Sequence, residues 1–158
     1  MTEKDEFFIK RAISLAQEGM RTKAGGPFGA VIVKDGHIVA EGYNMVTATN
    51  DPTAHAEVVA IRKACQALGS FQLVDCTIYT SCEPCPMCLG AIYWARPKNV
   101  VYACNKEDAA AIGFDDRFIY EELDRNMENR KITFVQMFQK EGRSVFREWE
   151  HMDHKIGY

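Results

Sequence analysis

Two short motifs constrain most strongly how this chain can fold. The first is His55-Ala56-Glu57, and the second is Pro84-Cys85 with Cys88 three residues further on. Each stands at the start of a predicted helix, and a predicted strand separates the two helices. Imidazole and thiol groups are ligands that Zn²⁺ takes readily. The pattern therefore predicts a fold that brings two helix N-termini to one metal ion.

The helical positions of these residues are compatible with one shared site. Cys85 and Cys88 belong to one helical turn, so both side chains lie on one face. His55 and Glu57 would be splayed by about 200° in a helix of about 3.6 residues per turn. This objection weakens where the site lies beyond the helix N-terminus. Two thiolates and a hydroxide around Zn²⁺ give a net negative cluster, which the positive ends of two helices stabilise.

The ligand set predicts a catalytic zinc site, with one Zn²⁺ in each subunit. Three protein ligands, His55, Cys85 and Cys88, leave the fourth tetrahedral position open for water, whose pKa the metal lowers towards about 7. Glu57 would take the proton of that water and hand it on. The combination H-x-E and P-C-x-x-C is the signature of zinc-dependent nucleobase deaminases. Spacing alone thus predicts hydrolytic deamination of an amino-substituted heterocycle.

Other interpretations of the same residues are open. His55 could be a hydrogen-bonded core histidine, and Glu57 a carboxylate that favours the helix dipole. Cys82 could supply a fourth protein ligand to a structural zinc. An iron–sulfur site from Cys82, Cys85 and Cys88 lacks the nearby fourth cysteine that such sites use.

The remaining sequence predicts alternating helices and strands. A helix is expected over 3–20, with Thr2 available as its N-cap, and a hairpin over 30–34 and 37–42 with a tight turn at Asp35-Gly36. Asp51-Pro52 is a helix entry for the segment 54–69. Further strands are expected at 73–81, 99–105 and 131–138, and further helices at 85–95, within 107–124 and at 143–154. This order predicts an α/β fold, a three-layer α-β-α sandwich with a central five-stranded mixed sheet, and a single domain over residues 1–158.

Charge and cysteine content exclude several classes of protein. The chain has 19 basic and 22 acidic residues, a net charge of −3, which argues against broad binding of nucleic acid or anionic lipid. It has no apolar run of the roughly 18–20 residues that span a membrane and no signal peptide, so we expect a cytoplasmic protein without a membrane partner. Thiols stay reduced there, and small buried side chains are expected at Cys65, Cys76 and Cys104.

Several stretches resemble the cytidine deaminase superfamily over nearly the whole chain. They are GGPFGAVIV at 25–33, NDPTAHAEVVAIRKAC at 50–65 and YTSCEPCPMCLGAIYWARP at 79–97. GFDDRFIYEE at 113–122 and the C-terminal Tyr158 are the narrower signature of the bacterial guanine deaminases within it. The resemblance implies a cytidine deaminase-like fold and the reaction of guanine with water to xanthine and ammonia, in purine catabolism.

The same resemblance implies roles for further residues. Asn44 and the backbone N–H of Ala56 would bind the carbonyl edge of a purine, and Phe28 and Trp94 would line an apolar pocket around its ring. Asp116 would relay a proton to the leaving amine as a second catalytic carboxyl. Tyr158 would close the site. In this family the C-terminal segment, about 139–158, can be exchanged between subunits, so a domain-swapped homodimer is implied.

Simpler roles for these residues are also open. Asp116 could be the N-cap of the following helix, and its neighbour Asp115 could face the pocket instead. Phe28 and Trp94 could be core residues, Asn44 a turn residue, and Tyr158 part of an idle tail.

Two other functions compete with a free-base deaminase. A tRNA adenosine deaminase would have to bind an anticodon loop. The segment 139–158 has four basic and four acidic residues, so it does not form a basic surface for RNA. A non-catalytic zinc module would have no use for Glu57 as a proton shuttle.

Overall fold

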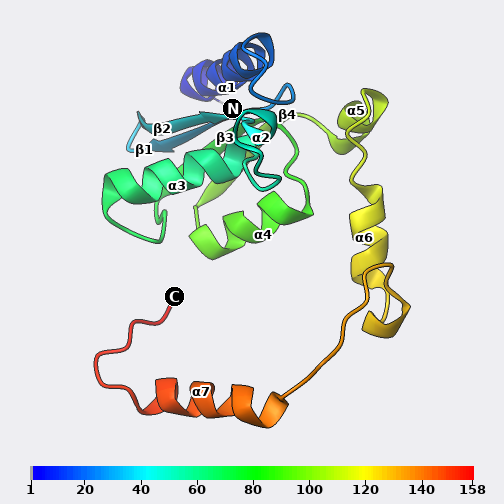
Figure 1. The fold of residues 1–158 in the computed structure, drawn as a ribbon. Coiled ribbons are helices and arrows are strands. Elements are labelled where there is room, and N and C mark those ends of the chain that lie inside the picture. Colours follow the sequence, from blue (N-terminus) through cyan, green and yellow to red (C-terminus); the bar gives the residue numbers. More distant parts are fainter. Residues whose placement is uncertain (1) are drawn as a thin grey trace. The chain divides into compact units, whose positions relative to one another are not determined.

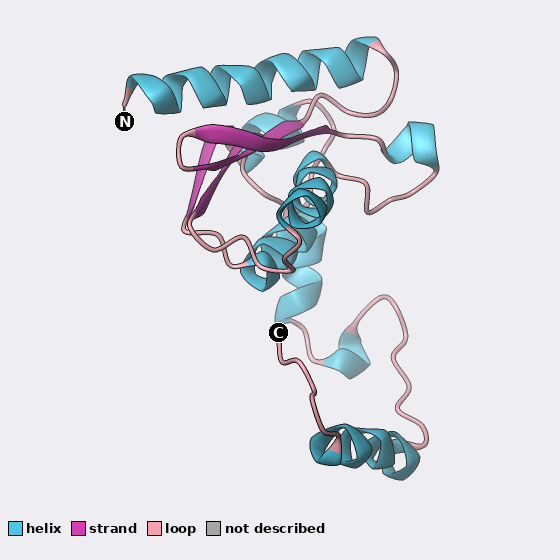
Figure 2. Ribbon diagram, turned by 90° about the vertical axis from the view of Figure 1, so that its left-hand side faces the viewer, coloured by secondary structure: helices cyan, strands magenta, loops and turns pink. Residues whose placement is uncertain are grey.

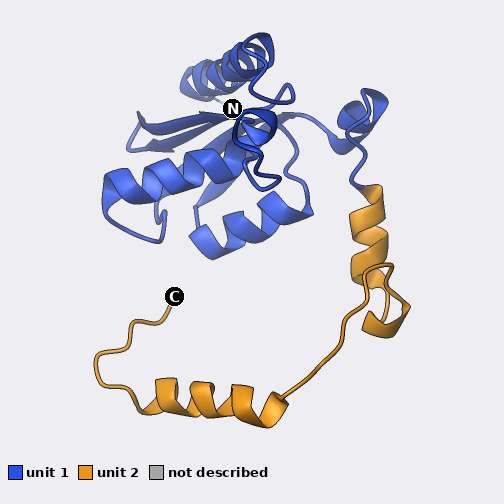
Figure 3. Cartoon of the chain, viewed as in Figure 1, with its two compact units in different colours: residues 1–116 blue, residues 117–158 orange. Residues whose placement is uncertain are grey.

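The computed structural model describes residues 2–158, which form two compact units (Figure 3). The first unit ends at Asp116, and the second is Arg117–Tyr158. The first holds a sheet covered by helices on both faces, and the second consists of helices and connecting segments. None of the described helices is both long and apolar enough to cross a membrane.

A mixed sheet of four strands forms the centre of the first unit. Its order is β2-β1-β3-β4, with β1 antiparallel to both β2 and β3, and β3 parallel to β4. The predicted hairpin is confirmed: Asp35 and Gly36 both have positive φ, 51° and 76°, as a tight two-residue turn requires. The strands are β1 Gly29–Lys34, β2 His37–Tyr43, β3 Cys76–Cys82 and β4 Asn99–Cys104.

Helices cover both faces of this sheet and make the predicted three layers (Figures 1 and 2). Helix α1 (Glu3–Arg21) lies on one face, and α3 (Ala56–Leu68) and α4 (Pro86–Ala95) lie on the other. Because side chains alternate along a strand, β3 supplies both cores. Tyr79 packs with Phe8 of α1, whereas Ile78 packs with Ala60 of α3.

Helix α1 is attached to the sheet by polar contacts as well as by its apolar face. Thr2 is its N-cap, as predicted, and forms a capping box with Asp5. The hydroxyl of Tyr79 donates a 2.6 Å hydrogen bond to Oδ1 of Asp5. Arg11 donates two hydrogen bonds of 2.7 Å to the carboxylate of Glu41 on β2, the strong bidentate form of this ion pair.

The helix predicted over 54–69 is confirmed as α3 (Ala56–Leu68), but it begins later than the predicted entry at Asp51-Pro52. A short helix, α2 (Val46–Thr49), comes first, and Oδ1 of Asp51 then accepts from the backbone N–H and the hydroxyl of Thr53. This local turn satisfies Asp51 outside the helix, so α3 starts at Ala56. A Cβ at Gly42 would lie 2.6 Å from the carbonyl oxygen of Ala56. The glycine therefore allows the start of α3 to approach the sheet.

The prediction that three cysteines are small buried side chains is wrong for Cys104. Cys76 is buried and Cys65 is intermediate, but Cys104 is exposed because it ends β4, one of the two edge strands of the described sheet. Helix α5 (Lys106–Ala111) follows, with a capping box between Asn105 and Asp108.

The second unit contains α6 (Arg117–Asp124), a 3₁₀ helix (Met127–Asn129) and α7 (Gln139–His151). The strand predicted at 131–138 is absent from the described structure, so the five-stranded sheet is corrected to four strands. An alternating pattern shows that a segment could form a strand, but a strand also needs a partner for its backbone groups. Helix α7 also begins and ends earlier than the predicted 143–154.

Candidate metal and catalytic centre

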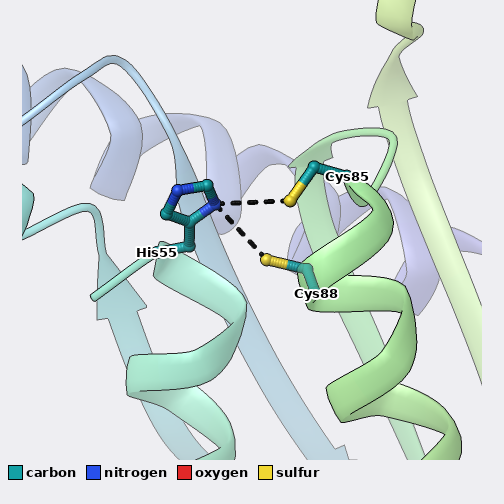
Figure 4. A group of neighbouring side chains, drawn as sticks. All are labelled: His55, Cys85 and Cys88. Carbon is teal, nitrogen blue, oxygen red and sulfur yellow. Dashed lines mark hydrogen bonds between the residues drawn. The ribbon is translucent and has the colours of Figure 1, made fainter. Parts of the chain in front are cut away.

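His55, Cys85 and Cys88 converge between the N-termini of two neighbouring helices (Figure 4). His55 is the N-cap of α3, and Cys85 is the N-cap of α4. Nδ1 of His55 lies 3.5 Å from Sγ of Cys85 and 3.5 Å from Sγ of Cys88. The three ligand atoms all lie within 4.8 Å of one another. The fold therefore assembles the predicted ligand set from residues remote in sequence.

These separations fit a single zinc ion. With Zn–S of about 2.3 Å, Zn–N of about 2.0–2.1 Å and a tetrahedral angle, nitrogen and sulfur should be about 3.6 Å apart. The measured 3.5 Å is close to this value. The two helix N-termini also supply positive potential to a site that collects thiolates.

The protonation of the cysteine pair suits metal binding as well. The neighbouring side chains of Cys88 and then His55 lower the pKa of Cys85 to about 4. The contact with Cys85 and burial raise the pKa of Cys88, and the hydrogen bond with Cys85 raises the pKa of His55. Cys85 thus carries negative charge readily, as a zinc ligand must, and bound zinc would favour the same form of Cys88.

Glu57 lies beside the ligands and is 6% exposed. Its Oε2 accepts a hydrogen bond from the thiol of Cys88 at 3.5 Å, and its Oε1 accepts from the hydroxyl of Thr80 at 3.4 Å. Burial is the main cause that raises the pKa of this carboxyl. Thr80 was not among the predicted site residues; the signal that could have found it is a polar residue on the same face of β3 as the buried Ile78.

Cys82 does not belong to the ligand cluster. Its thiol donates to the backbone carbonyl of Asn105 at 3.5 Å, and burial raises its pKa to about 11. The described ligand group contains His55, Cys85 and Cys88 without it. The geometry therefore opposes both a four-ligand structural zinc and an iron–sulfur site that use Cys82.

The two adjacent aspartates differ in their surroundings. Asp116 is partly buried, whereas Asp115 is exposed. Burial and then the negative charge of Cys85 raise the pKa of Asp116, so its carboxyl lies within electrostatic range of the cluster. Asp116 also directly precedes α6, the position that a helix N-cap occupies.

Asn44 is buried and holds the loop before β1. Its Oδ1 accepts from the backbone N–H of Gly26 at 3.3 Å and from that of Val46 at 3.1 Å. Its Nδ2 has no hydrogen-bond partner among the residues that the structure describes. A Cβ at Gly25 would lie 2.0 Å from Oδ1 of Asn44. Asn44 thus stabilises the loop through Oδ1, as a turn residue would, and its Nδ2 can still donate a hydrogen bond.

The other predicted substrate residues belong to different elements of the chain. Ala56 is the first residue of α3, where a backbone N–H has no partner within the helix. The ring of Phe28 meets the ring of Phe114 edge to face, with centroids 4.9 Å apart. Trp94 on α4 is 63% exposed, and Tyr158, in the second unit, is 73% exposed. Their roles stay predictions.

A three-layer α/β fold with His and two Cys at paired helix N-termini and a buried Glu beside them defines the class of zinc-dependent deaminases. The family model "Cytidine and deoxycytidylate deaminase zinc-binding region" matches residues 2–104, and the chain belongs to this family. Guanine deaminase from Bacillus subtilis is 62% identical over 153 residues, which are 97% of this chain and 98% of that protein.

Solved structures and more distant relatives agree with this placement. The crystal structure of the Bacillus subtilis guanine deaminase has a TM-score of 0.95 and 61% identity and covers 100% of this chain and 99% of its own. The structure of the guanine deaminase from Nitrosomonas europaea has a TM-score of 0.66 and 28% identity, and the match covers 89% of this chain and 81% of that chain. The tRNA-specific adenosine deaminase of Haemophilus influenzae is 38% identical over 73% of this chain and 69% of its own.

Proposed function

We propose that this chain is a guanine deaminase, which hydrolyses guanine to xanthine and ammonia. The observation that carries this function is similarity to the Bacillus subtilis guanine deaminase over almost the full length of both chains, at 62% identity. The relatives that act on tRNA are less similar and cover less of the chain. The ligand cluster with its buried Glu57 supplies the chemical groups that such a hydrolysis needs.

His55, Cys85 and Cys88 would hold one Zn²⁺ per subunit. When bound, the metal activates water for attack on the ring carbon that carries the amino group. Glu57 accepts the proton of that water and transfers it to the neighbouring ring nitrogen. Its burial favours the protonated form that this transfer requires, because a charged carboxylate is poorly solvated there. Asp116 then protonates the departing amine.

Substrate binding would use the groups that the fold leaves available beside this centre. Because Oδ1 of Asn44 is held by two backbone N–H groups, its Nδ2 is the free donor for the purine carbonyl. The N–H of Ala56 adds a second donor at the start of α3. Phe28, supported by Phe114, offers an apolar surface to the ring, and Trp94 and Tyr158 would complete the enclosure.

The whole chain would act as one deaminase domain in a homodimer, with the segment 139–158 exchanged between subunits. The second unit supports this arrangement, since α7 exposes apolar side chains that a partner could cover, among them Val145, Phe146 and Trp149. A dimer mass by light scattering is expected. Exchange is tested by mixing two inactive variants, one altered at Glu57 and one at Tyr158, and looking for regained activity.

A panel of free bases, nucleosides and tRNA, assayed for ammonia release, tests the substrate. We expect turnover of guanine, with little or none of adenine, cytosine, guanosine or tRNA. Turnover of tRNA or a nucleoside alone would replace guanine as the substrate, and no ammonia from any of them with stoichiometric zinc present would reject the function. We further place the reaction in purine breakdown in the cytoplasm.

A further inference from the structure

Among the described residues of the sheet, Thr80 is the one whose side chain donates a hydrogen bond to the proposed proton shuttle, Glu57. It lies in the middle of β3 and is 1% exposed, between strand partners Ala30 and Tyr102. Its hydroxyl has one hydrogen-bond partner among the described residues, Oε1 of Glu57, at 3.4 Å. A buried hydroxyl without a partner is costly. The hydrogen bond to Glu57 offsets this cost for the hydroxyl of Thr80.

The two oxygens of Glu57 have different partners, and zinc would affect only one of them. Oε2 accepts from the thiol of Cys88, and Oε1 from the hydroxyl of Thr80. A cysteine that binds zinc is deprotonated and can no longer donate. Loading the site therefore frees Oε2, which is the oxygen on the side of the metal ligands, while Thr80 still holds Oε1.

From this asymmetry we propose that Thr80 is a positioning residue of the reaction: its hydroxyl anchors Oε1 of Glu57, so that Oε2 faces the attacking water and the purine ring. The anchor sits on the central strand, where register with two neighbours keeps it fixed. The separation of 3.4 Å is long for such a bond, and catalytic hydrogen bonds often shorten only when substrate binds. This role rests on the proposed function of Glu57.

Paired variants separate the hydroxyl from the shape of the side chain. Thr80→Val keeps the shape and removes the hydroxyl, whereas Thr80→Ser keeps the hydroxyl. Because a carboxyl displaced by about 1 Å can cost 10²-fold, we expect Thr80→Val to lower kcat by about 10- to 100-fold with little change in KM or in zinc per chain. Thr80→Ser should recover most of kcat. Thr77→Val is the matched control: it is the same change on the same strand, at a residue whose side chain has no hydrogen bond to the part of the chain that the structure describes.

A second measurement does not depend on activity. The thermal midpoint of zinc-free Thr80→Ser should exceed that of Thr80→Ala, since only Ser can donate to Glu57. The gap should shrink or invert when Glu57→Met removes the acceptor. The Ser and Ala pair also carries the kinetic comparison if Thr80→Val does not fold.

Several results would overturn the positioning role. They are kcat of Thr80→Val within about twofold of the parent enzyme, equal kcat for the Ser and Ala variants, loss of zinc in Thr80→Val, or a Ser–Ala gap that Glu57→Met leaves unchanged. Glu57→Gln is assayed in parallel. If it stays active, the proposed role of Glu57 fails; if it is inactive while Thr80→Val is fully active, only the inference about Thr80 fails.

Discussion

Nδ1 of His55 lies 3.5 Å from Sγ of Cys85, although the two residues belong to different helices. Each residue is the N-cap of its helix, so the two side chains approach each other where the two helices begin. The packing of α3 and α4 on one face of the sheet thus sets the spacing of the ligands.

Removing one ligand should remove the metal. We expect Cys88→Ala to bind little zinc and to lose activity, because two protein ligands hold the ion poorly. Metal analysis of the purified protein measures this directly. Cys82→Ala is the matched control: its thiol donates to Asn105 outside the ligand group, so this variant should keep its zinc. Zinc retained in Cys88→Ala, or lost in Cys82→Ala, would contradict the ligand assignment.

Replacing the shuttle should spare the site and stop the reaction. Glu57→Gln keeps the side-chain shape and an oxygen that can accept from Thr80, but it cannot move a proton. We expect zinc content to stay at the parent level and kcat to fall by about 10²–10⁴-fold. Steady-state ammonia release and metal analysis on one preparation test both parts. Full activity in this variant would show that another group carries the proton.

Asn44 offers a way to separate loop support from substrate binding. Asn44→Asp keeps an oxygen that can accept from Gly26 and Val46 but loses the donor that we assign to the purine carbonyl. We expect kcat/KM for guanine to fall by about 10- to 100-fold, since an oxygen facing the carbonyl repels it. The thermal midpoint should change little. A parent-like kcat/KM would leave Asn44 with the turn role alone.

The contact between Tyr79 and Asp5 predicts a pH-dependent contribution to stability. The hydrogen bond from Tyr79, with those from Thr2, lowers the pKa of Asp5 from 3.8 to about 2. Because the folded pKa is below the unfolded one, this contribution is present in full above about pH 4 and is lost as the pH falls towards 2. Tyr79→Phe should therefore be less stable than the parent at pH 7.

Urea unfolding of the parent and of Tyr79→Phe at several pH values measures this effect. The difference in free energy of unfolding should be largest at neutral pH and should shrink below pH 4. A difference that stays constant down to pH 2 would mean that the pair contributes through packing alone. Tyr102→Phe, at an exposed side chain on β4, is the control and should change little at any pH.

The chain order of the fold was predictable because most of its elements carry local signals. The turn at Asp35-Gly36, the capping box of Thr2 and Asp5, and the glycine after α3 all act within a few residues. The errors came where local signals compete or need a distant partner. Asp51 satisfied its carboxylate in a turn and so delayed α3, and the segment 131–138 has a strand-like pattern without strand pairing in the described structure.

The sequence by itself determined the chemistry of the centre, since ligand types and their positions at helix starts are written in His55-Ala56-Glu57 and Pro84-Cys85-x-x-Cys88. Only the tertiary structure decided which groups surround them. Strand register and helix packing determine three such relations. The thiol of Cys82 donates to Asn105, Asp116 is more buried than Asp115, and the hydroxyl of Thr80 donates to Glu57. These relations join residues far apart in the chain, and no local pattern encodes the distance between them.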